Sequence, residues 1–207
     1  MWALGNDGAL RMSFRRRIRP ARNGGYELRL ATEERTLLTV LPGHLVSLLE
    51  GVGETPPGDL PDALRRLLPP AYTNDPDAER AYESMTRQDL LEHHRESLET
   101  MSATAHATWL DEDQLVSWLA ALNDLRLALG SMIGVTEDET EPPLGDEHQA
   151  EWITYLYLGG LQAELVDILE QTLPAPVPGA DDLVPEDHWG EPPGGLRWDG
   201  TPQPRYP

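Results

Sequence analysis

Residues 12–30 alternate between apolar and polar side chains, which is the pattern of strands that bury one face. The residues expected to face inward are Phe14, Ile18, Leu28 and Leu30. Between the two runs lies Asn-Gly-Gly at 23–25, whose residues tolerate a positive φ. The pattern therefore predicts a β-hairpin over residues 12–30. Because an isolated two-stranded ribbon is marginally stable in water, we expect its apolar side to lie on helices.

After this hairpin the apolar residues recur every three or four positions, which predicts helices. Thr32 precedes "EERTLLTVL" and is a suitable cap, whereas Pro42 and Gly43 predict a kink or a division into two shorter helices. The run "DALRRLLPP" predicts one short helix. Another helix is expected after Pro76, with a second start near Thr86.

Two longer helical patterns follow in the second half of the chain. Asp111 is positioned to cap a helix whose leucines share one face, and the last helix is expected from Gln149 to Leu173. Apolar residues cover more than half of that last helix, which indicates a central position or an interface. The expected fold class is therefore mainly α, with one multi-helix domain over residues 1–173 that includes the N-terminal β-hairpin.

Residues 174–207 are dominated by proline, glycine and acidic residues. Such a segment buries too little apolar surface to offset the entropy of ordering it, so we expect a disordered C-terminal tail. Trp189 and Trp198 stand out within it. They are either anchors for a protein partner or side chains folded back on the domain.

The composition narrows the possible function classes. None of the 207 residues is a cysteine, which excludes disulfides, thiolate metal sites and a thiol redox switch. No signal-peptide pattern opens the chain and no apolar run approaches the length of a membrane span, so we expect a cytoplasmic protein. The net charge of -20 repels a phosphate backbone and argues against nucleic-acid binding over the whole surface.

Arginines are nevertheless concentrated on the predicted hairpin, at Arg15, Arg16, Arg17 and Arg19. Such a charge asymmetry indicates a surface for a protein partner. Direct binding of duplex DNA through the same arginines is an alternative. A third interpretation is that the charges only keep an exposed strand edge soluble.

Arg126 interrupts the apolar stripe of the helix that follows Asp111, because at about 100° per residue it falls among the leucines of that face. On the last helix Gln162 also lies within the apolar arc, and Glu151 lies beside it. A buried arginine without partners is costly, so we expect Arg126, Asn123, Gln162 and Glu151 to form a buried polar cluster between the two helices. The cluster either fixes the helix register or forms a pocket for a ligand or partner.

The sequence carries no enzyme signature. None of its six histidines has the spacing of a helical metal site, and the adjacent His93 and His94 are expected to be exposed. No phosphate-binding loop is present, and no pair of acidic residues is singled out as acid and base. We therefore expect no catalytic, cofactor-binding or metal site.

The chain resembles the actinobacterial oxidative-stress transcriptional regulator (AosR-type) family, formerly a domain of unknown function. The resemblance rests on "WLAALNDLRLALGSMIGVTED" and "YLYLGGLQAELVDILE", and also on "FRRR", "LATEERTLLTVL" and "LRRLLPPAYTNDPDA". It implies a regulator that contacts a sigma factor of RNA polymerase and has no obvious DNA-binding motif. Redox sensing in that family depends on a cysteine pair, which this sequence lacks, so the resemblance carries over the interaction role without the thiol switch.

The sequence thus favours a non-enzymatic transcriptional regulator that acts by protein–protein contact with a sigma factor or RNA polymerase. The candidate partner surface consists of the hairpin arginines and the two tail tryptophans. A DNA-binding protein that uses the Arg-rich hairpin and an adaptor protein are the alternatives.

Overall fold

The computed structural model describes residues 16–22, 24–52, 55, 59–72, 74–135 and 148–172. Several expectations therefore lie outside the described residues. They concern Phe14, Arg15, Trp189, Trp198 and the disordered tail at 174–207.

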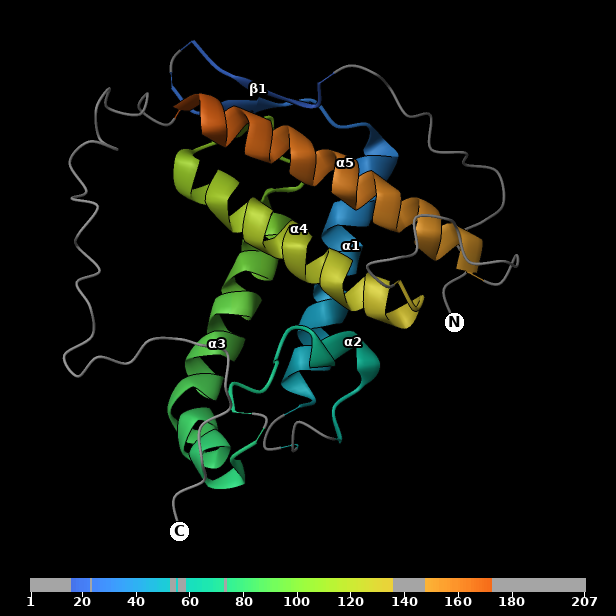
Figure 1. Ribbon diagram of the computed structural model, residues 1–207. Helices are drawn as coiled ribbons and strands as arrows, with labels where there is room; N and C mark the ends of the chain where they lie inside the picture. Colours follow the sequence, from blue (N-terminus) through green and yellow to red (C-terminus); the bar gives the residue numbers. More distant parts are fainter. Residues whose placement is uncertain are drawn as a thin grey trace, which may run out of the picture. The chain divides into compact units, whose positions relative to one another are not determined.

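The fold is mainly α-helical with an N-terminal antiparallel hairpin, as the sequence predicts (Figure 1). The helices are α1 (Thr32–Glu50), α2 (Asp62–Arg65), α3 (Pro76–Thr104), α4 (Glu112–Met132) and α5 (Gln149–Thr172). In Figure 1, α4 and α5 run antiparallel and side by side, α1 passes behind them, and α3, which packs against α1, lies below them. None of the described helices is long and apolar enough to cross a membrane.

Three short strands form one antiparallel sheet in the order β1 (Ile18–Pro20), β2 (Tyr26–Leu28) and β3 (Trp109–Leu110). Ile18 pairs with Leu28, and Tyr26 pairs with Leu110. The inward positions Ile18, Leu28 and Leu30 are buried, which confirms the predicted apolar side of the hairpin. The sequence pattern did not predict β3, since two residues are too few for alternation to be visible.

Gly25 is required by the turn of this hairpin. Its φ is +69°, and a Cβ built there would lie 2.3 Å from the Trp109 ring and 2.6 Å from the Leu110 carbonyl oxygen. The Trp109 indole also donates a hydrogen bond to the Gly24 carbonyl at 3.0 Å. The third strand is therefore held against the turn by a contact that only glycine permits.

Helix α1 continues through Pro42, so the predicted division into two helices is wrong. Pro42 lies on the buried face with Leu38, Leu45 and Leu49. The stability gained from this continuous packing exceeds the cost of the backbone hydrogen bond that proline cannot donate. The helix begins one residue earlier than expected, after Ala31, whose N–H donates to Glu34 Oε2 at 2.7 Å.

Helix α3 is also continuous, and the second start predicted at Thr86 is absent. The Thr86 hydroxyl donates to the Tyr82 carbonyl inside the helix and so does not cap a new one. The true cap is Asp75, whose side chain accepts hydrogen bonds from the N–H groups of Asp77 and Ala78. Asp111 caps α4 as predicted, through reciprocal hydrogen bonds with Gln114.

The core lies where α4 meets α1, α3 and α5. Trp118 is fully buried at its centre, and its indole donates to the Thr104 hydroxyl at 2.7 Å. Arg35 joins α1 to the end of α3 by donating to the carbonyl oxygens of Ala105 and Ala107 at 2.8 and 2.7 Å. Apolar packing and a few long-range hydrogen bonds thus hold the described helices together. The side chains that make such hydrogen bonds are the candidates for a functional site.

Candidate functional site

Arg126 reaches from α4 to α5 and contacts two neutral side chains there. Its Nη1 donates to Gln162 Oε1 at 2.5 Å, and its Nη2 donates to the Tyr155 hydroxyl at 3.2 Å. The guanidinium carbon also lies 5.0 Å from the centre of the Tyr155 ring, within the range of a cation–π contact. The structure therefore brings together Arg126 and Gln162, the central pair of the predicted cluster.

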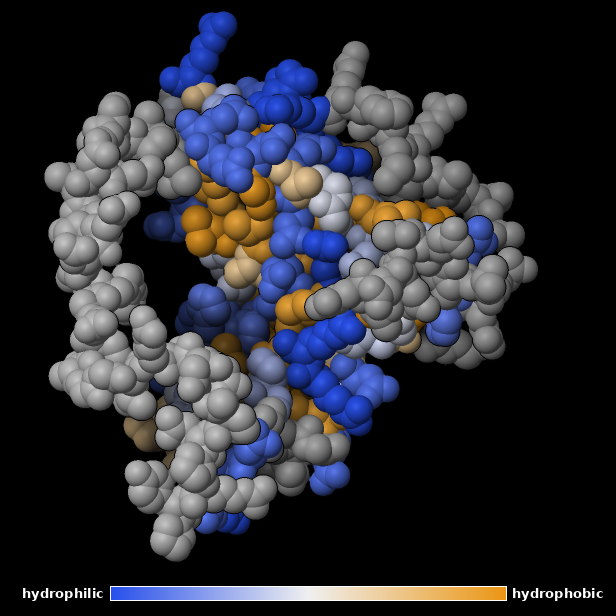
Figure 2. Space-filling view, in the orientation of Figure 1, coloured by the Kyte–Doolittle hydropathy of each residue, from blue (hydrophilic) through white to orange (hydrophobic). Residues whose placement is uncertain are grey.

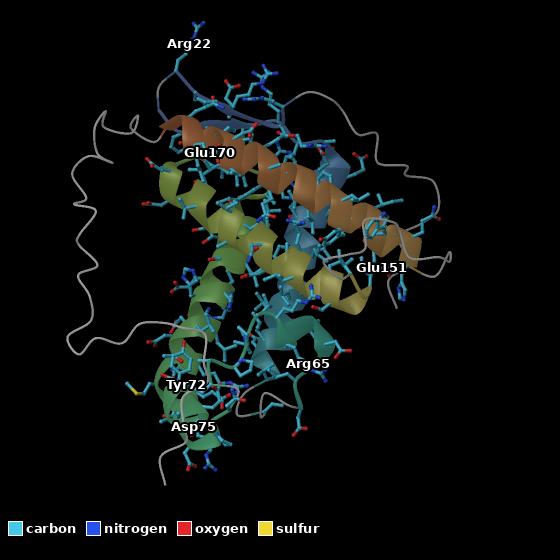
Figure 3. All side chains as sticks on the ribbon, in the orientation of Figure 1. Arg22, Arg65, Tyr72, Asp75, Glu151 and Glu170 are labelled. Carbon is cyan, nitrogen blue, oxygen red and sulfur yellow. The ribbon has the colours of Figure 1, made fainter. Side chains whose placement is uncertain are left out.

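The other two members of that predicted cluster lie elsewhere. Asn123 is exposed, because its position on α4 is turned past the contact with α5 toward solvent. Glu151 is half-buried in the first turn of α5, one turn before Tyr155 (Figure 3), and it is not among the hydrogen-bond partners that Arg126 has in the described chain. The cluster is thus smaller than predicted, and it includes Tyr155, an aromatic residue that was not among its predicted members.

That aromatic member belongs to a stack. Trp152 and Tyr155 lie with ring centroids 5.7 Å apart and planes 22° apart, and Arg126 covers the same Tyr155 ring. We call Trp152, Tyr155 and Arg126 the ladder. The spacing Trp152–Tyr155 at i, i+3 on a helix was a signal that could have located it.

Two glycines make room for the ladder. A Cβ at Gly130 would lie 3.3 Å from the Tyr155 ring. A Cβ at Gly159 would lie 3.4 Å from Arg126 Nε, 3.5 Å from Cζ and 3.7 Å from Nη2, so this glycine lies over the face of the guanidinium. The Nε atom of Arg126 is buried and has no hydrogen-bond partner among the described residues.

Arg126 also has no ionic partner among the described residues. Within the part of the chain that the structure describes, no carboxylate lies within 4.0 Å of its guanidinium nitrogens. Its charge is therefore held by an amide, a hydroxyl and an aromatic face.

Arg17 shows the opposite arrangement, and the prediction that it belongs to an exposed partner surface is wrong. Its Nε donates to Glu34 Oε1 at 2.8 Å, and its Nη1 donates to Glu164 Oε1 at 2.7 Å. Its side chain is only 11% exposed and lies over the Tyr157 ring. Although burial opposes the charge, the hydrogen bond and charge of Glu34 and the charge of Glu164 raise the pKa of Arg17.

The neighbouring arginines of the hairpin remain on the surface. Arg16 and Arg19 are exposed, and Arg16 lies 3.6 Å from the Asp167 carboxylate of α5. The described part of the predicted basic surface is therefore reduced, because one of its arginines is buried between two carboxylates.

His94 was expected to be exposed, but its side chain is only 12% exposed, on the side of α3 that faces Asp124 of α4. Its Nδ1 lies 2.7 Å from Asp124 Oδ2, and Asp124 is only 3% exposed. Burial lowers the pKa of His94, but the hydrogen bond and charge of Asp124, together with the Leu67 backbone, raise it above the ordinary value. Its Nε2 is buried without a hydrogen bond of normal geometry. Asp124 lies between Ala121 and Ala128 on one face of α4, and these small residues were the signal of its burial.

The outer surfaces of α4 and α5 carry apolar side chains. Val116 on α4 is 52% exposed, and the exposed apolar residues of α5 are Ile153, Leu156 and Val166. Figure 2 shows hydrophobic surface over this pair of helices. No group of three or more histidine, aspartate or glutamate side chains in the described residues is placed to hold a metal ion.

The fold and these contacts define a helical domain in which a small sheet and two polar sites connect the last helix to the rest of the chain. Residues 13–169 match the model of a family described as a domain of unknown function, DUF2017, and the chain belongs to that family. No curated protein and no solved structure matches the chain.

Proposed function

We propose that this chain is a non-enzymatic transcriptional regulator that acts by binding a sigma factor or RNA polymerase in the cytoplasm. The observation that carries the proposal is the exposed apolar surface of α4 and α5. Val116 and Val166 are both exposed on this helix pair, which also contains Arg126. Contiguous exposed apolar surface on a soluble domain marks an interaction site more often than chance exposure does.

The resemblance to the oxidative-stress regulators supports the same proposal. Its most specific part, the Asn-Asp-Leu-Arg-Leu run, lies in α4, and "YLYLGGLQAELVDILE" lies in α5; these two helices carry the exposed apolar residues. Their inner faces form the core. For a protein that acts by protein–protein contact, the outer faces of α4 and α5 are the surfaces available to the partner.

The experiment is retention of RNA polymerase and purified sigma factors on the immobilised full-length chain. We expect at least one subunit to be retained at low salt and to be lost when Val116→Asp and Val166→Asp are combined. Val40→Asp is the matched control, because Val40 is 45% exposed but lies on α1. Retention of no subunit at low salt would overturn the proposal, and so would equal loss with the control variant.

A further inference from the structure

We infer that a groove between α1 and α3 receives a basic side chain, a lysine or an arginine, from a segment of a protein partner. The groove has a volume of about 300 Å³. Its lining comes from both helices and consists of Leu49, Glu50, Gln88, Leu91, Glu92 and Arg95. We call it the α1–α3 groove. None of these residues belongs to α4 or α5, so the groove is a second surface and its assignment does not rest on the proposed function.

The α1–α3 groove is apolar at its base and open at its rim. Leu49 is 5% exposed and Leu91 is half-buried, whereas Glu50, Gln88 and Glu92 are exposed. Lysine and arginine combine an apolar stem with a charged end. Such a side chain can therefore place its stem on the two leucines and keep its charge at the exposed carboxylates.

The end of α1 adds negative charge to the groove. Glu50 is the last residue of α1, and the last turn of this helix contains no basic residue. The C-terminus of a helix carries a partial negative charge, so a carboxylate is unfavourable there and a cation is favourable. Glu50 forms no ion pair with a described residue, and residues 51–61, which follow it, include no arginine, lysine or histidine.

The basic residue that lines the groove already has partners of its own. Arg95 Nη2 donates to Glu92 Oε1 at 3.0 Å, and Arg95 Nη1 donates to both carboxylate oxygens of Glu99 at 2.9 and 3.1 Å. Together with Glu50, three carboxylates thus accompany one guanidinium. The groove keeps an excess of negative charge, which complements a cation brought by a partner.

Exposed apolar residues continue from the groove along α3. Met85 and Tyr82 lie about one and two turns before Gln88, and they are 79% and 43% exposed. Tyr72 lies against Tyr82, with ring centroids 6.0 Å apart (Figure 3). Contiguous apolar exposure of this kind marks a contact with another macromolecule. It fits a protein segment that has an apolar residue beside its cation, whereas a free polyamine or a metal ion would leave it uncovered.

The charge of the whole chain favours the same partner. A net charge of -20 attracts a basic segment at long range and repels a second copy of the chain. Salt screens exposed charges beyond about 10 Å at an ionic strength of about 0.1 M. We therefore expect added salt to slow the association of the chain with its basic partner.

The first test uses a labelled peptide of lysine, leucine and alanine as the probe, and the same peptide with glutamine in place of lysine as its control. We expect the full-length chain to bind the lysine peptide and not the glutamine peptide. Combining Glu50→Gln with Glu92→Gln should weaken this binding at least about tenfold, which corresponds to about 1.4 kcal/mol. Fluorescence anisotropy at low salt measures the affinities.

The matched control variant combines Glu33→Gln with Glu96→Gln. Glu33 and Glu96 are exposed on α1 and α3 but do not line the groove, and their replacement changes the net charge by the same amount. This variant should change the affinity less than about twofold, because solvent and salt screen charges away from the contact. Glu50→Gln should be at least as stable as the wild type, since it removes a carboxylate from a helix C-terminus. Urea unfolding of each variant separates lost binding from lost structure.

The second test places a photo-crosslinker at Gln88 of the full-length chain in its native cell. The exposed His93 of the same helix is the control position. We expect Gln88 to crosslink to a partner segment that contains lysine or arginine. The crosslink should be lost when Glu50→Gln and Glu92→Gln are combined, and it should persist with Glu33→Gln and Glu96→Gln.

Equal affinity for the two peptides would overturn the inference, and so would an equal loss of binding in the two double variants. A Gln88 crosslink only to a second copy of this chain, only to a segment without a basic residue, or no stronger than that of the His93 control has the same consequence. Retention of polymerase or a sigma factor through Val116 and Val166 is measured separately. The proposed function can therefore fail while the assignment of the groove holds, and the reverse.

Discussion

Arg126 of α4 donates a hydrogen bond to Gln162 of α5 across the antiparallel helix pair, and no carboxylate among the described residues pairs with this arginine. The bond fixes how far one helix can slide along the other. Its energy can be measured separately from any binding role of the arginine.

We expect Gln162→Leu to lower the free energy of unfolding by about 1–3 kcal/mol, because it removes the acceptor of a charged donor. The effects of Arg126→Met and Gln162→Leu should not add, since each removes the same bond. A double-mutant cycle from urea unfolding measures the coupling. Additive effects would show that the bond contributes nothing to the helix pair.

Arg17 is expected to be the most costly hairpin arginine to replace. Arg17→Met leaves Glu34 and Glu164 facing each other without their cation, and breaking such a buried pair costs about 3–5 kcal/mol. Arg19→Met, at an exposed position two residues further along the hairpin, is the control, and it should change the free energy of unfolding by less than about 0.5 kcal/mol. Thermal or urea unfolding of the two variants checks the difference, and equal effects would contradict the ion-pair account.

The stability of the domain should depend on pH through His94. Its pKa is raised above the ordinary value of 6.5, so its stabilising contribution is complete below pH 6.5 and is lost as the pH rises through the pKa of the folded state. We expect His94→Gln and Asp124→Asn to flatten this decline. Urea unfolding at a series of pH values above 6 measures it.

The matched control for this pH dependence is His93→Gln. His93 is an exposed neighbour on α3, so this variant should keep the slope of the wild type. A decline that survives in His94→Gln would assign the pH dependence to another group.

The two turn glycines should differ in their tolerance of alanine. Gly25→Ala places a methyl group within 2.3 Å of the Trp109 ring and also requires a positive φ, whereas Gly24→Ala meets only the second difficulty. Gly24→Ala should cost about 1–2 kcal/mol. Gly25→Ala should cost clearly more and should change the tryptophan fluorescence of the folded state. Equal costs would mean that β3 is not held by this contact.

Patterns confined to one element were predictable from the sequence. The cap at Asp111, the apolar face of the following helix and the inward side of the hairpin follow from spacing alone. Pro42 and Thr86 misled the prediction, because Pro42 was interpreted as a local signal of a kink or helix end and Thr86 as a local signal of a helix start. Packing of Leu38 and Leu45 around Pro42 decides the outcome there, and local propensity does not include that packing.

The polar contacts were less predictable for the same reason. Arg126 was identifiable because it interrupts an apolar stripe, and its partner Gln162 does likewise on the last helix. Arg17 fits an alternating strand pattern and was assigned to the surface, yet its partner Glu164 lies 147 residues away in the sequence. The local periodicity of the sequence carries no information about a pair of residues so far apart.

The contact between Arg17 and Glu164 also affects when the hairpin can reach its final structure during translation. Glu164 accepts hydrogen bonds from both the backbone N–H and the guanidinium of Arg17, which directly precedes β1, so the hairpin is joined to α5, the last helix of the described residues. A nascent chain that has not yet released α5 from the ribosome lacks one of the two carboxylates for that arginine. We therefore expect the hairpin to gain its full protection from proteases only after α5 has left the ribosome.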